Sequence, residues 1–418
     1  MKSKSMFYGA LLFTLGAPAA AVAQLNTAAR PLPAAGQATW LPAQAGDMAP
    51  AALAAPASTL PASLNTNRTP MAYSWSLPAD TALAAADAGH IGESRQYWLD
   101  VSGRELAEGV EIDTVSRSAV IRISPLDDPG VSLRAPDLHL ESRGRALDQT
   151  SAVASLVSAE QLRAAGADFP EGTLAFRLRP EVEPGTLRLS LANTGRPDDR
   201  FVVHVHEPAS DVVATVGTGR SAYLAGETVT IDFAVAHAAG DVSGFAVSPD
   251  GKTVAPLTFI GAGDRYRAIL PAQAAAATGL WEIHALFDGR AHGLRVRRDV
   301  KTALQVALPT ARLTGAVDIS RTSSGLVFGL GVQNSVPGRY QVSGVLYGTV
   351  ENGGFKPLGA AHSAAWLNPG TGRIEMAFDA AVLAQKGINP PFELRDLRLS
   401  DQSRLALLQR QARAVVVK

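Results

Sequence analysis

Two histidines, His204 and His206, lie two residues apart in a strand-like segment and could bind a metal ion. Side chains at positions i and i+2 of a strand project to the same face of a sheet, so both imidazoles could reach one ion. A third ligand could come from His139, Asp199 or Glu207. The alternative is a pair of histidines on a solvated sheet face or in a seam between domains. Because structural zinc requires four ligands, we favour the seam and predict no cofactor.

Aromatic residues could instead stack on a sugar ring. Trp366 directly precedes a Leu-Asn-Pro-Gly loop, and Tyr97 lies beside Trp98 on a predicted strand, where one ring must point inward and one outward. We take Trp366 and Tyr97 as the candidate stacking residues. Trp281 is assigned to a core, because it alternates in register with other apolar residues. An aromatic content of 6% argues against a dedicated lectin.

Motifs for catalysis are absent from the sequence. There is no Gly-x-Ser-x-Gly, His-Glu-x-x-His, phosphate-binding loop or dinucleotide fingerprint. Aspartates at 127–128 and 198–199 stand beside Pro or Gly, so turns explain them without calcium. Acidic residues that could cleave glycosides lie at outward positions of alternating strands, which solvent exposure explains; they are Glu282, Glu375, Glu393 and Asp396. We therefore predict that the protein is not an enzyme, although a catalytic triad is defined in space and not by a motif.

Composition and the first residues indicate the compartment. The chain has no cysteine, which excludes disulfides, lipidation and thiol chemistry, and its 38 basic and 38 acidic residues give no field that would attract nucleic acid. Lys2 and Lys4 precede an apolar stretch that ends in the cleavage-site pattern Ala21-Val22-Ala23. This pattern predicts a signal peptide over residues 1–23 and export to the periplasm or the extracellular space. No later stretch reaches roughly 18 apolar residues, so we predict no transmembrane segment in the mature chain.

The remaining sequence predicts an all-β fold of three consecutive β-rich domains. Residues 24–69 are rich in Ala and Pro and predict a disordered linker. Segments of period-two alternation between turn residues then predict an N-terminal β-rich domain over 70–208, an immunoglobulin-like β-sandwich over 209–308 and a C-terminal β-sandwich over 309–418. Short helices are expected in the first and third domains, after Ser158, which forms a capping-box pattern with Gln161, and after Asp379. Residues 351–354 predict a hairpin turn.

Several segments together resemble a known family. These are 94–103, 119–125, 223–231, 279–284 and 391–401. They are similar to exported bacterial proteins of unknown function that are built from three β-rich domains. The resemblance covers about residues 70–418 and implies this architecture, but no catalytic residue. The middle domain also looks like the bacterial immunoglobulin-like modules that accompany adhesive or enzymatic domains.

We expect an exported, non-enzymatic binding or scaffold protein of the bacterial cell envelope. Its partner would be an envelope protein or glycan, held by sheet edges and interdomain loops. One alternative is a carbohydrate-binding or hydrolase-accessory protein that uses Trp366 and Tyr97. Another is a metal-dependent secreted enzyme that uses His204 and His206.

Overall fold

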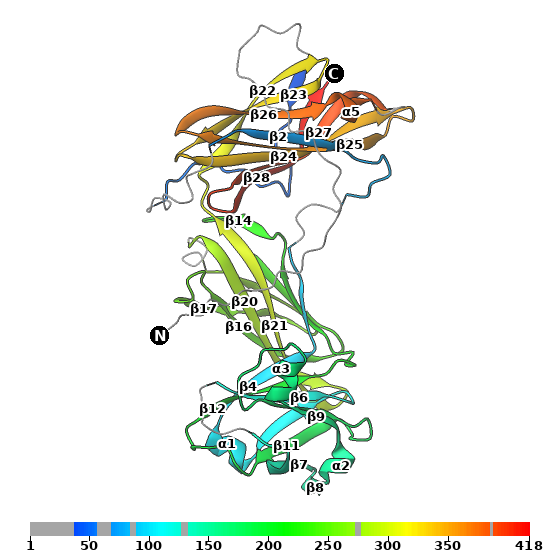
Figure 1. Ribbon diagram of the computed structural model, residues 1–418, viewed down its shortest axis with the longest axis vertical. Helices are drawn as coiled ribbons and strands as arrows, with labels where there is room; N and C mark the ends of the chain where they lie inside the picture. The colour runs from blue at the N-terminus through cyan, green and yellow to red at the C-terminus, as the bar shows by residue number, and fades with distance from the viewer. Residues whose placement is uncertain (1–36, 57–67, 84–88, 127–132, 272–276, 385–387) are drawn as a thin grey trace.

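Three β-sandwiches follow one another along the long axis of the molecule (Figure 1). The structure is a computed structural model, and it describes residues 37–56, 68–83, 89–126, 133–271, 277–384 and 388–418. The strands in these ranges form six sheets, and the helices are short. The predicted all-β, multidomain fold is confirmed.

The lower domain in Figure 1 is a sandwich of two sheets with the strand orders β4-β12-β6-β10-β9 and β5-β11-β7-β8. Its strands are β4 (Gln96–Ser102), β5 (Val110–Thr114), β6 (Val120–Pro125), β7 (Leu138–Ser142), β8 (Arg145–Leu147), β9 (Val153–Ser158), β10 (Leu174–Leu178), β11 (Gly185–Leu191) and β12 (Arg200–His206). Its helices are α1 (Gly103–Glu108), the 3-10 turn η2 (Ala135–Asp137), α2 (Gln149–Ala152) and α3 (Ala159–Ala164). The Ser158 side chain caps α3 in the predicted capping box, and Ser102 with Glu105 forms a second box on α1.

The middle domain has the strand order of an immunoglobulin-like sandwich. One sheet is β18-β19-β15-β13-β3 and the other is β14-β21-β20-β16-β17, with β14 parallel to β21. The strands are β3 (Gly92–Ser94), β13 (Ala214–Thr218), β14 (Ala222–Leu224), β15 (Thr230–Val235), β16 (Ala239–Val247), β17 (Val254–Thr258), β18 (Ile260–Ala262), β19 (Arg265–Ile269), β20 (Gly279–Ala291) and β21 (Leu294–Ala307). Trp281 is fully buried in the core between the sheets, as its register predicts.

The upper domain pairs a six-stranded sheet, β1-β28-β27-β24-β25-β2, with a three-stranded sheet, β22-β23-β26. The strands are β1 (Ala38–Trp40), β2 (Met71–Ser76), β22 (Ala311–Thr322), β23 (Gly325–Asn334), β24 (Gly338–Val350), β25 (Phe355–Leu367), β26 (Gly370–Asp379), β27 (Ile388–Asp401) and β28 (Ala406–Val417). The helix after Asp379 is α5 (Ala380–Leu383). The predicted turn at 351–354 joins β24 to β25 as a hairpin.

Two predicted boundaries are corrected by strand pairing. Residues 37–56 are not a free linker, because β1 pairs with β28 and Met48 is buried in the upper core. Residues 71–76 do not begin the lower domain, because β2 pairs with β25 of the upper one. β1 and β2 hydrogen-bond to the edges formed by β28 and β25, because an edge strand presents unpaired N–H and C=O groups to an extended segment. The strand β3 likewise joins the middle domain through β13.

A buried ion pair joins the lower and middle domains. Arg298 on β21 and Glu207 after β12 have side chains that are 0% and 1% exposed, and their nearest N and O atoms are 2.8 Å apart. The other carboxylate oxygen of Glu207 accepts the backbone N–H groups of Val115 at 2.6 Å and Ser116 at 2.7 Å. Arg298 also donates to the Val212 carbonyl and the Ser210 hydroxyl, both at 2.9 Å. Oε1 of Glu207 therefore holds two backbone N–H groups, whereas its Oε2 has the ion-pair contact with Arg298 and no hydrogen-bond partner among the described residues.

Candidate binding surface

Exposed apolar side chains gather at two places on the molecule. Of twelve exposed large hydrophobic residues in the described ranges, three project from β2 and three surround one sheet face of the middle domain. The first group is Met71, Tyr73 and Trp75; the second is Ile91, Ile260 and Ile269. Such clusters on a protein surface mark contact sites more often than single exposed residues do.

The first group lies on the outer face of the six-stranded sheet. Residues 71, 73 and 75 alternate along an extended strand, so their side chains project to one side. We call this surface the β2 face and define it by Met71, Tyr73, Trp75, Gln341, Ser343, His362, Arg395 and Arg398. Its strands are β2, β25, β24 and β27, which lie side by side in the upper domain (Figure 1).

Three rings form a cluster at one end of the β2 face. Tyr73 is paired with His362 on β25, and their ring centroids are 5.5 Å apart. The Trp75 ring lies 5.8 Å from Tyr73 and 5.3 Å from His362. Tyr73 and Trp75 remain 49% and 42% exposed. The ring surfaces are thus held in place by one another and are still open to a ligand.

Polar side chains continue from this cluster across the sheet. The register places Tyr73, His362, Ser343, Arg398 and Arg410 in one row over five strands. Gln341 contacts the Nδ1 atom of His362 at 3.2 Å. Burial lowers the pKa of His362, and the charge of Arg398 lowers it further, so the ring is neutral at neutral pH. The row therefore offers hydrogen bonds next to the rings.

Arginines dominate the far end of the row. Asp396 accepts from Arg398 and Arg410, and Glu393 accepts from Arg395 and Arg413. Four guanidinium groups and two carboxylates leave a net charge of +2. The β2 face therefore runs from exposed rings to positive charge.

Trp366 lies on the same side of β25 as His362, but its indole is not open for stacking. The guanidinium of Arg68 covers the ring, with its central carbon 4.8 Å from the ring centroid. The indole is half-buried, and its Nε1 atom is buried without a hydrogen-bond partner among the described residues. The position of Trp366 before a loop predicts an exposed ring, but the structure shows this ring half-buried beneath Arg68.

Tyr97 is corrected as a stacking residue, since it is 1% exposed. Its hydroxyl donates to the carbonyl of Asp113 at 2.9 Å and accepts from the Asp113 N–H at 2.7 Å. Burial raises the pKa of this phenol. The neighbouring Trp98 points outward, because Tyr97 is in register with the core residues of the lower domain.

His204 and His206 project from β12 to the same face, as the strand pattern predicts. Their ring centroids are 6.4 Å apart, and His204 stacks on Trp98 at 4.8 Å. The Nε2 atom of His204 lies 2.9 Å from the amide oxygen of Gln96. Burial first, then Arg122 and His206, lowers the pKa of His204 to about 4. Among the described residues no group of three or more His, Asp or Glu side chains could hold a metal ion.

The possible third ligands have other roles in the structure. Glu207 is bound to Arg298, and Asp199 accepts from the backbone N–H and the guanidinium of Arg196. His139 lies on β7, in the sheet opposite β12. The metal hypothesis for His204 and His206 is left with two ligands.

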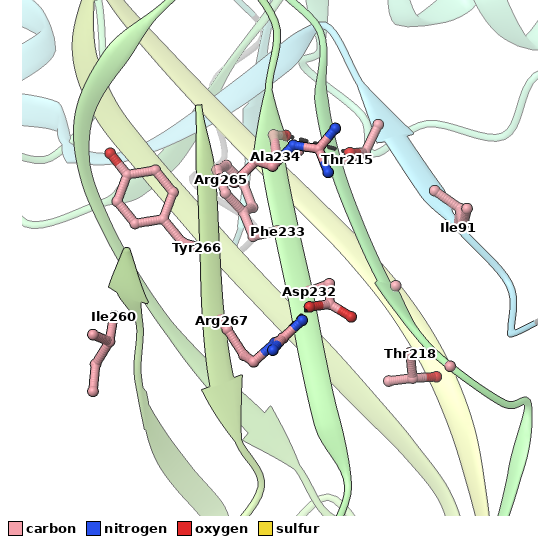
Figure 2. A pocket seen from close by; sticks show the side chains of 12 residues that line it. Ile91, Thr215, Thr218, Asp232, Phe233, Ala234, Ile260, Arg265, Tyr266 and Arg267 are labelled. Carbon is pink, nitrogen blue, oxygen red and sulfur yellow. Dashed lines mark hydrogen bonds and ion pairs between the residues drawn. The ribbon is translucent and has the colours of Figure 1, made fainter. Parts of the chain in front are cut away.

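Two members of the second apolar group, Ile91 and Ile260, line a groove on the middle domain (Figure 2). This groove lies on the outer face of β18-β19-β15-β13-β3 and has a volume of about 550 Å³. Ile91 and Ile260 stand on opposite sides, and Asp232, Arg265 and Arg267 lie between them (Figure 2). We name it the middle-domain groove.

No sequence motif marks the β2 face or the middle-domain groove. The segment 71–76 alternates aromatic or apolar residues with small ones, which is a visible strand signal. That signal does not say which side faces solvent, because large rings normally face a core. The middle-domain groove left no motif, since its side chains come from strands and a loop spread over 91–267.

Two domain models of one protein family match parts of this chain. The family described as "Domain of unknown function (DUF4785) N-terminal domain" matches residues 62–207, and the DUF4785 C-terminal domain matches residues 310–418. The crystal structure of a DUF4785 family protein from Legionella pneumophila is similar at a TM-score of 0.64 and 19% identity, covering 90% of this chain and 98% of that one. At this identity the similarity shows a common fold alone.

Other similarities are weak. Salmonella alpha-2-macroglobulin reacted with methylamine aligns with a TM-score of 0.21 and 14% identity, covering 81% of this chain and 24% of that one. No curated protein matches the chain. No helix in the described ranges has the length and apolar character needed to cross a membrane.

Proposed function

The chain belongs to the DUF4785 family, whose function is unknown, and we propose that it is an exported, non-catalytic protein of the cell envelope that binds an acidic glycan on the β2 face. The observation that carries this proposal is the cluster of exposed rings formed by Tyr73, Trp75 and His362. Export to the periplasm or beyond is supported by the signal-peptide pattern of residues 1–23.

A sugar matches the chemistry of the ring cluster. The C–H groups on one face of a pyranose are apolar and slightly positive, and an aromatic face is negative, so the two attract. The hydroxyl groups at the rim of the sugar require hydrogen bonds, which Gln341, Ser343 and His362 can supply next to the rings. A purely apolar partner would leave these polar groups unpaired.

The arginines favour an acidic sugar over a neutral one. The row from Tyr73 to Arg410 spans five strands, or about 19 Å at the usual spacing of about 4.8 Å. This length accommodates several linked sugar rings. A carboxylate on such a chain would meet Arg398, whose guanidinium is partly exposed, and planar guanidinium groups bind carboxylates well.

Binding of two polymers by the purified full chain tests the proposal. Polygalacturonate is the acidic probe and dextran is the neutral one, and isothermal calorimetry gives the affinity. Trp75→Ala should weaken binding of polygalacturonate about tenfold, because a lost stacking contact costs on the order of 1.4 kcal/mol. Trp98→Ala removes an exposed tryptophan of the lower domain and is the matched control.

Arg398→Gln tests the charge. It should lower the affinity for polygalacturonate and reduce its dependence on salt, and leave any binding of dextran unchanged. Equal binding of wild-type protein and Trp75→Ala would refute the β2 face as the site. If neither polymer binds at millimolar sugar concentration, the glycan proposal is rejected.

The metal-dependent alternative has less structural support, because among the described residues His204 and His206 lie side by side on β12 without a third His, Asp or Glu side chain in reach of the same ion. A partner protein of the envelope would also fit an exposed strand such as β2. The proposal requires that Trp75→Ala lower the affinity for polygalacturonate and that Trp98→Ala leave it unchanged, whereas a site for a partner protein alone would not bind the polymer.

A further inference from the structure

We propose that the middle-domain groove is a second binding site, independent of the β2 face, and that its ligand is an aliphatic carboxylate. The groove is built on the outer face of one sheet of the immunoglobulin-like domain (Figure 2). Its volume of about 550 Å³ suits a small molecule, since ligand sites in proteins usually measure roughly 300–1,000 Å³.

The depth of the groove comes from the sizes of the side chains on neighbouring strands. Thr215 and Gly217 on β13 and Ala234 on β15 are small and form the floor. Long side chains on β19 and β18 rise on one side, and Ile91 rises on the other.

The walls are unusually apolar for a surface exposed to water. Ile91 and Ile260, which line it, are 62% and 76% exposed. Ile260 is paired with Arg267 across the ladder. Covering these two isoleucines with hydrocarbon would release about 25 cal/mol for each Å² removed from water. The aromatic residues among those that line the groove, Phe233 and Tyr266, are only 2% and 9% exposed, because their rings belong to the core.

One positive charge in the groove is unmatched. Arg267 is paired with Asp232 at 2.9 Å. Within the ranges that the structure describes, Arg265 has no carboxylate within ion-pair distance. Its neighbours on the floor are Thr215 and Ala234, and the Thr215 hydroxyl donates to the Ala234 carbonyl at 3.3 Å. The guanidinium of Arg265 is therefore the main free donor, and a carboxylate is the group it binds best.

Hydrocarbon walls and one free guanidinium together specify an aliphatic chain that ends in a carboxylate. An aromatic or highly hydroxylated ligand would find neither stacking partners nor enough acceptors and donors. A dianion would be opposed by Asp232, which lies beside Arg267 and already accepts a hydrogen bond from it.

Calorimetric titration of the full chain with decanoate, decanol and acetate tests this inference. Decanoate should bind at least tenfold more tightly than decanol, which lacks the charge, and acetate, which lacks the chain. Arg265→Gln should weaken decanoate at least fivefold and leave decanol unchanged. Ile260→Ser should weaken both. Lys252→Gln removes an exposed charge in a distant turn of the same domain and should change neither.

The inference is overturned if decanoate and decanol bind equally, if decanoate does not bind below its micellar concentration, or if Arg265→Gln binds it as wild type does. Trp75→Ala should leave decanoate binding unchanged, so failure of the glycan proposal does not affect this result. Circular dichroism of each variant confirms that the sandwich is folded.

Discussion

Glu207→Ala should destabilise the junction between the lower and middle domains more than any surface change. The substitution leaves the guanidinium of Arg298 buried without its counter-ion, with a side chain that is 0% exposed. It also leaves the N–H groups of Val115 and Ser116 without their common acceptor. Both effects arise from the loss of one carboxylate that bridges β12, β21 and the loop after β5.

The magnitude follows from these contacts. Removing one partner of a buried ion pair costs about 3–5 kcal/mol. A buried N–H that loses its acceptor costs about 1–3 kcal/mol on its own. The N–H groups of Val115 and Ser116 share one acceptor, so their two costs are not additive. We expect a loss of about 4 kcal/mol. Glu207→Gln keeps an amide oxygen for the two N–H groups and loses only the charge, so its cost should be smaller.

Hydrogen–deuterium exchange resolves the effect by domain, which a single unfolding midpoint of a three-domain chain does not. A loss of about 4 kcal/mol should speed exchange in β12 and β21 by about three orders of magnitude, because 1.4 kcal/mol is a factor of ten. The upper domain should be unaffected. Asp232→Asn breaks an exposed pair and serves as the control, with an expected change below about 1 kcal/mol. If Glu207→Ala changes exchange less than tenfold, the pair contributes no net stability and the reasoning fails.

Two further predictions concern pH, and both are read from hydrogen–deuterium exchange in β12 and β21, the strands that carry His204 and Asp299. Between pH 6.5 and about 4 the unfolded chain takes up a proton at His204 that the folded chain does not, so wild-type protein should lose stability relative to His204→Gln as the pH falls through this range. Burial raises the pKa of Asp299 from 3.8 to about 6, so the folded chain keeps a proton that the unfolded chain releases. Wild-type protein should therefore lose stability relative to Asp299→Asn as the pH rises from 3.8 to 6. If the stability of wild-type protein and of either variant changes with pH in the same way, the pKa shift assigned to that residue is wrong.

Local features of the fold could be predicted because they depend on residues close in sequence. The capping box at Ser158 requires only Ser158 and Gln161, and the hairpin turn at 351–354 requires only its own glycines and asparagine. The burial of Trp281 follows from its alternation with Ile283. In each case the signal and the structure involve the same few residues.

Partners that are distant in sequence could not be predicted. Period-two alternation identifies 71–76 as a strand, but pairing with 359–364 depends on which sheet edge is open. Likewise, alternation shows that Tyr97 and Trp98 point to opposite sides, and only the core of the lower domain decides that Tyr97 is the buried one. The β2 face therefore became visible only when the strand order was known.

The path of the chain through the three domains has a consequence for the order in which they can form. The chain contributes first to the upper sheet through β1 and β2, next to the middle domain through β3, and only then builds the lower domain. It returns through the middle domain and ends at β28, where Val417 pairs with Ala38. During synthesis the lower domain can close first, the middle domain second and the upper domain last. The strand that carries Tyr73 and Trp75 has to wait for residues made almost 300 positions later, so the ring cluster cannot form before β25 has been synthesised.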